Sequence, residues 1–180
     1  MNFKSLFVLA SLAVCSFAET SIAQVQKDIS NQMASAVINF STTVHAFPIW
    51  GGTAGQAMSI HYSAIALNNV IANTTNDMNN ITSDLSDADF LSIIGHLQAL
   101  EPSFLRSIEG LAIRKPAFAV LPLGNLPALL KLDLATMKTS ADNFMDEFIS
   151  LASPNVLPAA RAMKLSVDST FSTVLAIYNI

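Results

Sequence analysis

Apolar residues recur every three or four positions along most of the chain, and almost no segment alternates strictly between apolar and polar side chains. A period of about 3.6 residues is typical of amphipathic helices that bury one face. It predicts five helices, at about residues 24–46, 53–82, 86–115, 126–151 and 158–178. Connections of roughly two to ten residues favour antiparallel neighbours. The pattern therefore predicts an all-α fold, an antiparallel five-helix bundle.

Turn and capping signals mark several helix ends. Proline and two glycines in the segment 47–52 prevent the first helix from continuing. Ser86 and Asp89 form a capping box that opens the third helix. The apolar phase of that helix continues across Pro102, which favours one kinked helix, although a new helix starting at Pro102 is the alternative. Pro116 is expected to end the third helix.

The longest apolar run lies at the N-terminus, directly after Lys4. A basic start, a short apolar run and small residues near its end are typical of a signal peptide. We assign residues 1–18 to this leader, with cleavage as late as residue 23. The alternative, an N-terminal membrane anchor, is disfavoured because the run is too short to span comfortably. Residues 24–180 then form one secreted, extracellular helical domain.

Composition and charge narrow the class of protein. Hydrophobic residues make up 52% of the chain and charged residues 12%, with a formal net charge of −4. Because no basic patch is present, nucleic acid and anionic lipid head groups are not expected as partners. The one cysteine, Cys15, lies in the leader, so the mature domain has no thiol for a disulfide or a nucleophile. The C-terminal segment lacks the stalk and apolar tail of a glycolipid anchor, so no such anchor is expected.

Three acceptor sequons accompany the predicted export, at Asn39, Asn73 and Asn80. Asn73 and Asn80 are seven residues apart and therefore lie on the same side of the second helix, away from its apolar stripe. Asn39 lies at the flank of the first helix's stripe. We expect glycosylation at these three sites, most readily at Asn73 and Asn80.

The sequence offers no candidate motif for catalysis or for metal binding. The chain contains no Gly-x-Ser-x-Gly, His-Glu-x-x-His or P-loop sequence. His45, His61 and His96 have no partner at metal-ligand spacing. The aspartates in 84–89 lack the glycine and closing glutamate of a calcium loop. We therefore expect no enzyme activity, no metal and no cofactor.

The apolar stripes offer a different kind of site. The interior of a helical bundle is a usual place for an elongated apolar ligand, and methionine adapts its shape readily. The seven methionines and eleven phenylalanines lie largely on the stripes, although a simply well-filled core is the alternative. A continuous void lined by Phe40, Leu67, Phe104 and Phe148 would favour a carrier. The candidate lining residues are Met33, Val37, Phe40, Ile60, Ala64, Leu67, Ile71, Leu97, Phe104, Ile108, Met137, Phe144, Phe148, Phe171 and Leu175.

Three polar residues interrupt or border these stripes and are candidate anchors for a ligand head group. Glu101 falls on the inward stripe of the third helix beside Pro102. A kink that opens its carboxylate to solvent is the alternative explanation. Gln56 and Ser63 border the stripe of the second helix. A few polar groups at the edge of an apolar channel are what a lipid site needs for orientation.

Several short motifs, in order and spacing, resemble one known family. They are the leader, residues 25–29, 47–52, 85–89, 114–118 and 176–178, and Ala57 and Ile60. Together they cover nearly the whole mature chain and resemble the fungal hydrophobic surface binding proteins and cell wall galactomannoproteins. The resemblance implies a five-helix bundle, secretion or cell wall association, and affinity for hydrophobic surfaces or long-chain fatty acids.

These observations favour a secreted, non-catalytic protein that binds long-chain fatty acids or similar lipids, as a monomer or weak dimer. One alternative is adsorption to hydrophobic solid surfaces and recruitment of secreted enzymes. Another is a structural cell wall mannoprotein whose partner is cell wall polysaccharide. The missing stalk departs from the wall-anchored members of the family, which favours a freely secreted form.

Overall fold

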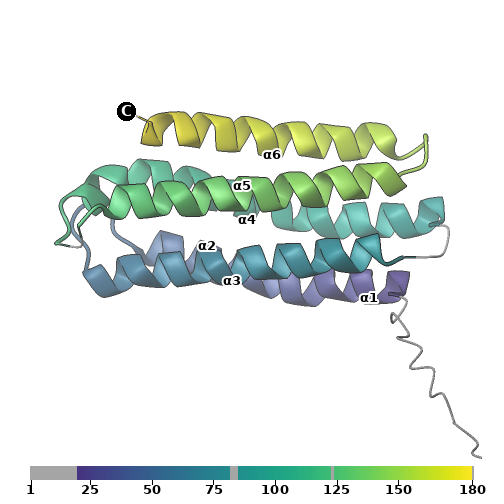
Figure 1. Cartoon of the computed structure of the whole chain (residues 1–180), viewed down its shortest axis with the longest axis horizontal. Coiled ribbons are helices and arrows are strands. Elements are labelled where there is room, and N and C mark those ends of the chain that lie inside the picture. The colour runs from purple at the N-terminus through teal and green to yellow at the C-terminus, as the bar shows by residue number, and fades with distance from the viewer. Residues whose placement is uncertain (1–19, 82–84, 123, 180) are drawn as a thin grey trace, which may run out of the picture.

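The structure is a computed structural model that describes residues 20–81, 85–122 and 124–179. Its helices lie side by side and run alternately in opposite directions (Figure 1). They are α1 (Ile22–Lys27), which continues through the π-helical turn η1 (Asp28–Met33) into α2 (Ala34–Ala46), and α3 (Ala54–Asn79), α4 (Asp87–Ala119), α5 (Leu126–Leu151) and α6 (Leu157–Tyr178). With α1, η1 and α2 counted as one, the described residues form five helices. This confirms the predicted all-α antiparallel bundle.

The helices pack around one apolar core. α3 packs against α2 and α5, α6 packs against α4 and α5, and α2 packs against α4. The core includes six fully buried phenylalanines: Phe40, Phe47, Phe90, Phe118, Phe148 and Phe171. Burying one such side chain contributes roughly 1.5–3 kcal/mol relative to leaving it exposed. The stripes read from the sequence are therefore the main source of the bundle's stability.

The first helix contains a π-helical turn that the sequence pattern did not predict. Ser21 caps its start by accepting a hydrogen bond from the Gln24 backbone N–H at 3.2 Å. Its buried residues then follow in three successive steps of four, from Val25 to Val37. Each four-residue step drifts by about 40° on an ideal α-helix. The wider turn of η1 absorbs this drift and keeps one face of the helix inward.

Two predicted helix ends are wrong. α3 ends at Asn79 instead of continuing to residue 82, because the Asn80 side-chain amide donates to the Asn76 carbonyl oxygen at 2.8 Å and caps the last turn. α4 continues past Pro116 to Ala119. Proline in the last turn removes only one helical hydrogen bond there. The neighbouring Lys115 holds that turn in place by donating from Nζ to the Ile177 carbonyl oxygen at 2.7 Å.

Other boundary predictions are confirmed. α4 is one helix across Pro102, so the alternative of a new helix at that proline does not apply. Ser86 and Asp89 form the predicted capping box, and Thr53 and Gln56 form a second one at the start of α3. Each box satisfies backbone N–H groups that the first helical turn leaves free.

The predicted leader falls mostly outside the described part of the chain, since residues 1–19 are not described. Among the residues that the structure describes, no helix combines the length and the hydropathy needed to cross a membrane.

Candidate ligand-binding site

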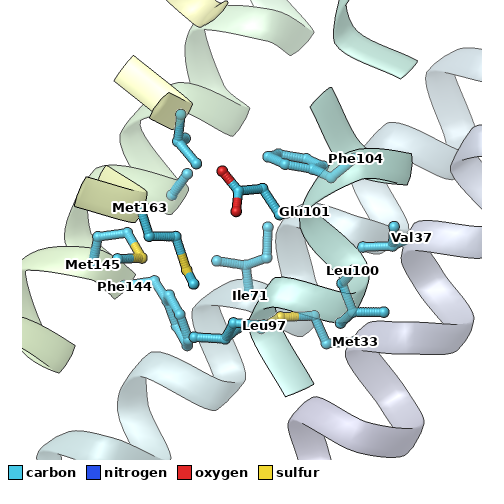
Figure 2. Close-up of a pocket in the computed structure, with 12 residues that line it drawn as sticks. Met33, Val37, Ile71, Leu97, Leu100, Glu101, Phe104, Phe144, Met145 and Met163 are labelled. Carbon is cyan, nitrogen blue, oxygen red and sulfur yellow. The ribbon is translucent and has the colours of Figure 1, made fainter. Parts of the chain in front are cut away.

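An apolar pocket lies inside the bundle where five helical segments meet, and Figure 2 shows the side chains around it. It has a cavity volume of about 70 Å³. The lining residues are Met33, Val37, Ile71, Leu97, Leu100, Glu101, Phe104, Ala141, Phe144, Met145, Met163 and Val167. Eleven of these twelve side chains are apolar, so the pocket suits a hydrocarbon chain.

The pocket opens on one turn of α4. Nine of the lining residues are buried, whereas Leu100, Glu101 and Phe104 are only half-buried. Pro102 lies exposed in the same turn. Because proline has no backbone N–H, this turn lacks the helical hydrogen bond that residue 102 would donate to Gln98. The mouth of the pocket therefore coincides with the weakest point in the middle of α4.

Aromatic rings form two walls of the pocket and are supported from behind. The Phe104 ring packs against Phe171, with centroids 5.9 Å apart and planes tilted by 60°. The Phe144 ring stacks on Phe148, with centroids 6.5 Å apart. Phe148 and Phe171 are fully buried, so they hold the two lining rings in position without reaching the pocket themselves.

Three methionines, Met33, Met145 and Met163, line the pocket from three different elements. The present cavity of about 70 Å³ is several times smaller than the roughly 300 Å³ at which sites for drug-sized ligands begin. A long acyl chain can enter only if lining side chains move. Unbranched methionine side chains with three rotatable bonds are well suited to such movement.

Glu101 is the one polar residue among those that line the pocket. Figure 2 shows its carboxylate among apolar side chains, between Phe104 and Met163 in this view. Within the described residues, the Glu101 carboxylate has no hydrogen-bond or ion-pair partner. Its position at the mouth combines the two sequence-based expectations, since it faces the pocket and is also partly open to solvent.

The structure brings together only part of the predicted lining. Six of the predicted residues line the pocket: Met33, Val37, Ile71, Leu97, Phe104 and Phe144. The others lie elsewhere in the core or at its edge: Phe40, Ile60, Ala64, Leu67, Ile108, Met137, Phe148, Phe171 and Leu175. Of the four residues expected around a continuous void, only Phe104 lines this pocket.

Five lining residues were not assigned to the site from the sequence: Leu100, Ala141, Met145, Met163 and Val167. Ala141, Met163 and Val167 lie on the predicted stripes, whereas Leu100 and Met145 lie beside them. The stripes alone do not show which positions of different helices lie at the same level. Identifying these five residues requires the register between the helices, which the sequence pattern does not contain.

The remaining candidate polar residues lie away from the pocket. Gln56 is exposed, and its side-chain oxygen accepts a hydrogen bond from the Thr53 backbone N–H at 2.9 Å. Ser63 is buried and donates to the Ile60 carbonyl oxygen at 2.8 Å. Both side chains therefore have partners in α3 or in its N-cap that compete with any ligand.

All three sequon asparagines, Asn39, Asn73 and Asn80, are exposed. Glycans attached at these positions would therefore face solvent. Thr82, the last residue of the Asn80 sequon, lies outside the described residues.

The outer side of the α5–α6 wall carries a network of ion pairs. The Lys138 Nζ atom lies 2.7 Å from a carboxylate oxygen of Asp142 and 3.2 Å from one of Asp168. The Lys164 Nζ atom lies 3.4–3.6 Å from carboxylate oxygens of Asp142, Asp146 and Asp168. The hydrogen bond with Asp142, together with the one to Asp168, raises the pKa of Lys138 against the opposing effect of burial. The network joins α5 to α6 beside the pocket and closes this wall.

A second polar pair links α3 to α5. The His61 Nδ1 and Asp133 Oδ2 atoms are 2.8 Å apart. Burial raises the pKa of Asp133, and the hydrogen bond with His61 and the charge of His61 lower it by less. Across residues 20–81, 85–122 and 124–179, no group of three or more His, Cys, Asp or Glu side chains is arranged to hold a metal ion.

Solved structures with the same fold share very little sequence with this chain. The crystal structure of AfMP4p in complex with palmitic acid matches with a TM-score of 0.78 and 20% identity, over 88% of this chain and 99% of that one. Ligand binding domain 1 of the Penicillium marneffei MP1 protein, complexed with arachidonic acids, matches with a TM-score of 0.77 and 16% identity, over 89% of this chain and 100% of that one. At such identities, these likenesses show the fold.

Comparison with curated proteins finds no match. The model of the family described as Hydrophobic surface binding protein A matches residues 22–150, which span α1 to α5 and most of the chain. This match confirms the resemblance that the sequence motifs indicated, and the chain belongs to the hydrophobic surface binding protein A family.

Proposed function

We propose that this protein is a non-catalytic lipid carrier. It holds a long acyl chain, such as that of a fatty acid, in the pocket that α4 and the neighbouring helices enclose. The observation that carries the proposal is the almost wholly apolar lining, with three methionines and with half-buried residues beside Pro102 at its mouth. The similarity in fold to structures complexed with palmitic and arachidonic acids supports it.

The energetics fit a carrier that binds and releases its ligand. Burying ten methylene groups of an acyl chain contributes roughly 8 kcal/mol. Widening the pocket and restricting the ligand subtract from this amount. Since about 8.2 kcal/mol corresponds to a dissociation constant of 1 μM, a chain that buries ten methylene groups should bind no more tightly than about micromolar.

The test combines extraction and displacement. Mass spectrometry of organic extracts from protein produced in its own host should show a long-chain lipid, and the purified protein should release a fluorescent fatty acid when an unlabelled one is added. Ala141→Leu, which fills the pocket, should weaken binding at least tenfold. Ala135→Leu on the exposed face of α5 is the matched control and should not. An extract that contains no long-chain lipid, together with no release of the fluorescent fatty acid, rejects the proposal.

Secretion and glycosylation complete the proposal. Cleavage after Ala18 leaves Ser21, the cap of α1, in the mature chain, whereas cleavage after Ala23 removes it together with the first residues of the helix. We therefore expect the secreted protein to begin at Glu19 and to carry glycans at Asn73 and Asn80. Intact-mass measurement before and after deglycosylation checks both expectations. Such glycans are also what a role beside cell wall polysaccharide would use.

Adsorption to hydrophobic solids, with recruitment of secreted enzymes, is a second candidate function that a separate observation favours. The α2–α3 and α4–α5 connections lie at the same end of the bundle (Figure 1). They carry the exposed apolar residues Ile49, Trp50 and Val120, of which Trp50 is 81% and Val120 is 74% exposed. We call these three residues the apolar tip. Depletion from solution by polyester or alkane particles, compared with albumin, tests this role.

A further inference from the structure

We propose that Glu101 makes the pocket selective for lipids whose polar head donates a hydrogen bond, such as long-chain alcohols or amines, over free fatty acids. This inference rests on the proposed lipid-carrier function and specifies the chemistry of its ligand.

The position of Glu101 supplies the first argument. Its side chain lies in the half-buried turn at the mouth, where the head group of a chain inserted into the pocket must come to rest. Leu100 and Phe104 beside it are apolar. Glu101 is therefore the polar group of the lining that a ligand head group meets first.

Glu101 is unpaired in the part of the chain that the structure describes, whereas the lysines of the opposite wall are already paired with aspartates. Within the described residues, its carboxylate has neither a hydrogen-bond nor an ion-pair partner. Lys138 and Lys164, on the two helices that form the opposite wall, are already held by aspartates of the α5–α6 network. Arg106 is exposed on α4, and five residues place it about 140° around the helix from Glu101.

Elementary electrostatics then decides which head group fits. An ionised carboxylate accepts hydrogen bonds and donates none. The carboxylate of a fatty acid at the same mouth would meet a like charge in a partly desolvated place, where repulsion is less screened than in bulk water. A hydroxyl or ammonium head supplies the missing donor and, in the second case, an opposite charge.

The experiment compares four ligands with the same sixteen-carbon chain: hexadecanol, hexadecylamine, hexadecanoate and methyl hexadecanoate. Each displaces a neutral fluorescent lipid from the full-length secreted protein near pH 7, at concentrations below micelle formation. The alcohol and the amine should bind at least tenfold more tightly than hexadecanoate, a difference of about 1.4 kcal/mol. The ester, which has no charge and no donor, should fall between them.

Substitution of the carboxylate isolates its role. Glu101→Gln should bring the affinities for the alcohol and hexadecanoate to within about threefold, because the amide carries no charge and can donate to a carboxylate. Glu109→Gln, on the exposed side of the same helix, should leave the tenfold preference unchanged. Circular dichroism establishes that both variants are folded.

The outcomes separate this inference from the proposed function. Hexadecanoate binding as tightly as the alcohol in the unmodified protein overturns the inference and leaves the carrier function intact, and so does a preference that Glu101→Gln does not alter. Failure of all four chains to displace the probe overturns the carrier function itself. A preference for the amine that the alcohol does not share also overturns the inference, because charge alone, and not hydrogen-bond donation, then selects the ligand.

Discussion

Arg114 anchors the connection between α2 and α3 from inside the bundle. Its Nε atom donates to the Phe47 carbonyl oxygen at 2.7 Å, and its terminal nitrogens donate to the Gly110 and His45 carbonyl oxygens at 3.1 and 3.4 Å. Burial lowers the pKa of Arg114. Carbonyl groups at the C-terminal end of α2, the negative end of its dipole, compensate for this burial. The Phe47 ring then packs on Phe118, with centroids 4.6 Å apart.

At Gly52, in the same connection, both the backbone conformation and the neighbouring ring exclude a side chain. Its φ of +102° is a region that other residues rarely adopt, and a Cβ atom there would lie 2.6 Å from the buried Phe47 ring. Gly52→Ala should lower the free energy of unfolding by about 1–3 kcal/mol, measured by urea denaturation. Gly95→Ala is the control, because its Cβ meets open space on α4 and should raise stability by up to about 1 kcal/mol. Equal effects of the two substitutions would contradict this account.

At the scale of elements, α4 contains two prolines with different surroundings. Pro102 lies at the pocket mouth, whereas Pro116 lies in the last turn, between Lys115 and the buried Ala117. Replacing either by alanine restores a helical hydrogen bond and should raise the free energy of unfolding by up to about 3 kcal/mol. Only Pro102→Ala should also slow the uptake of a fluorescent fatty acid, because opening the mouth then breaks one more backbone hydrogen bond, the one from residue 102 to Gln98. Stopped-flow uptake rates that are equal for Pro102→Ala and Pro116→Ala would show that α4 does not open there.

The link between α3 and α5 predicts a pH dependence of stability. Because burial raises the folded-state pKa of Asp133, the folded protein binds this proton more tightly than the unfolded chain does. The contribution of Asp133 is therefore greatest below the ordinary aspartate pKa of about 3.9, and it declines as pH rises through the raised value. Asp133→Asn cannot ionise, so the stability of the unmodified protein relative to this variant should fall as the pH rises from below about 3.9 towards neutrality. Urea denaturation across this range measures the difference, and a constant difference would refute the prediction.

The helices show which structural features local sequence can predict. The cap at Ser86 and the continuity of α4 across Pro102 follow from local residue types and apolar phase. Pro116 was expected to end α4 because proline lacks an N–H. The helix continues because Arg114 and Lys115 bond to α2 and α6, contacts that a single segment does not reveal. The turn η1 escaped prediction because its steps of four residues also fit an α-helical stripe.

At the scale of the whole molecule, the site depends on how the helices align along the bundle. The stripe of the first helix contains both Met33 and Phe40, yet only Met33 reaches the level of Glu101 and lines the pocket. Phe40 lies two turns further along and packs in the core. The sequence therefore predicts which face of each helix is buried. The level of the pocket depends on the register between helices, which packing of the complete core determines.

The same alignment separates the pocket from the apolar tip. The pocket lies within the bundle, while Ile49, Trp50 and Val120 lie in or beside the connections at one end. Lipid uptake and surface adsorption can therefore be altered independently of one another. Variants of the tip should leave displacement of a fluorescent fatty acid unchanged.

Trp50→Ser tests the role of the tip in adsorption. An exposed indole contributes a large apolar area to contact with a hydrophobic solid, so its removal should reduce adsorption to polyester particles severalfold. Leu165→Ser is the matched control, because Leu165 is 70% exposed on α6, outside the tip. It removes an exposed aliphatic side chain and should have a smaller effect. Depletion isotherms measure both variants, and equal losses would show that adsorption uses exposed apolar residues over the whole surface.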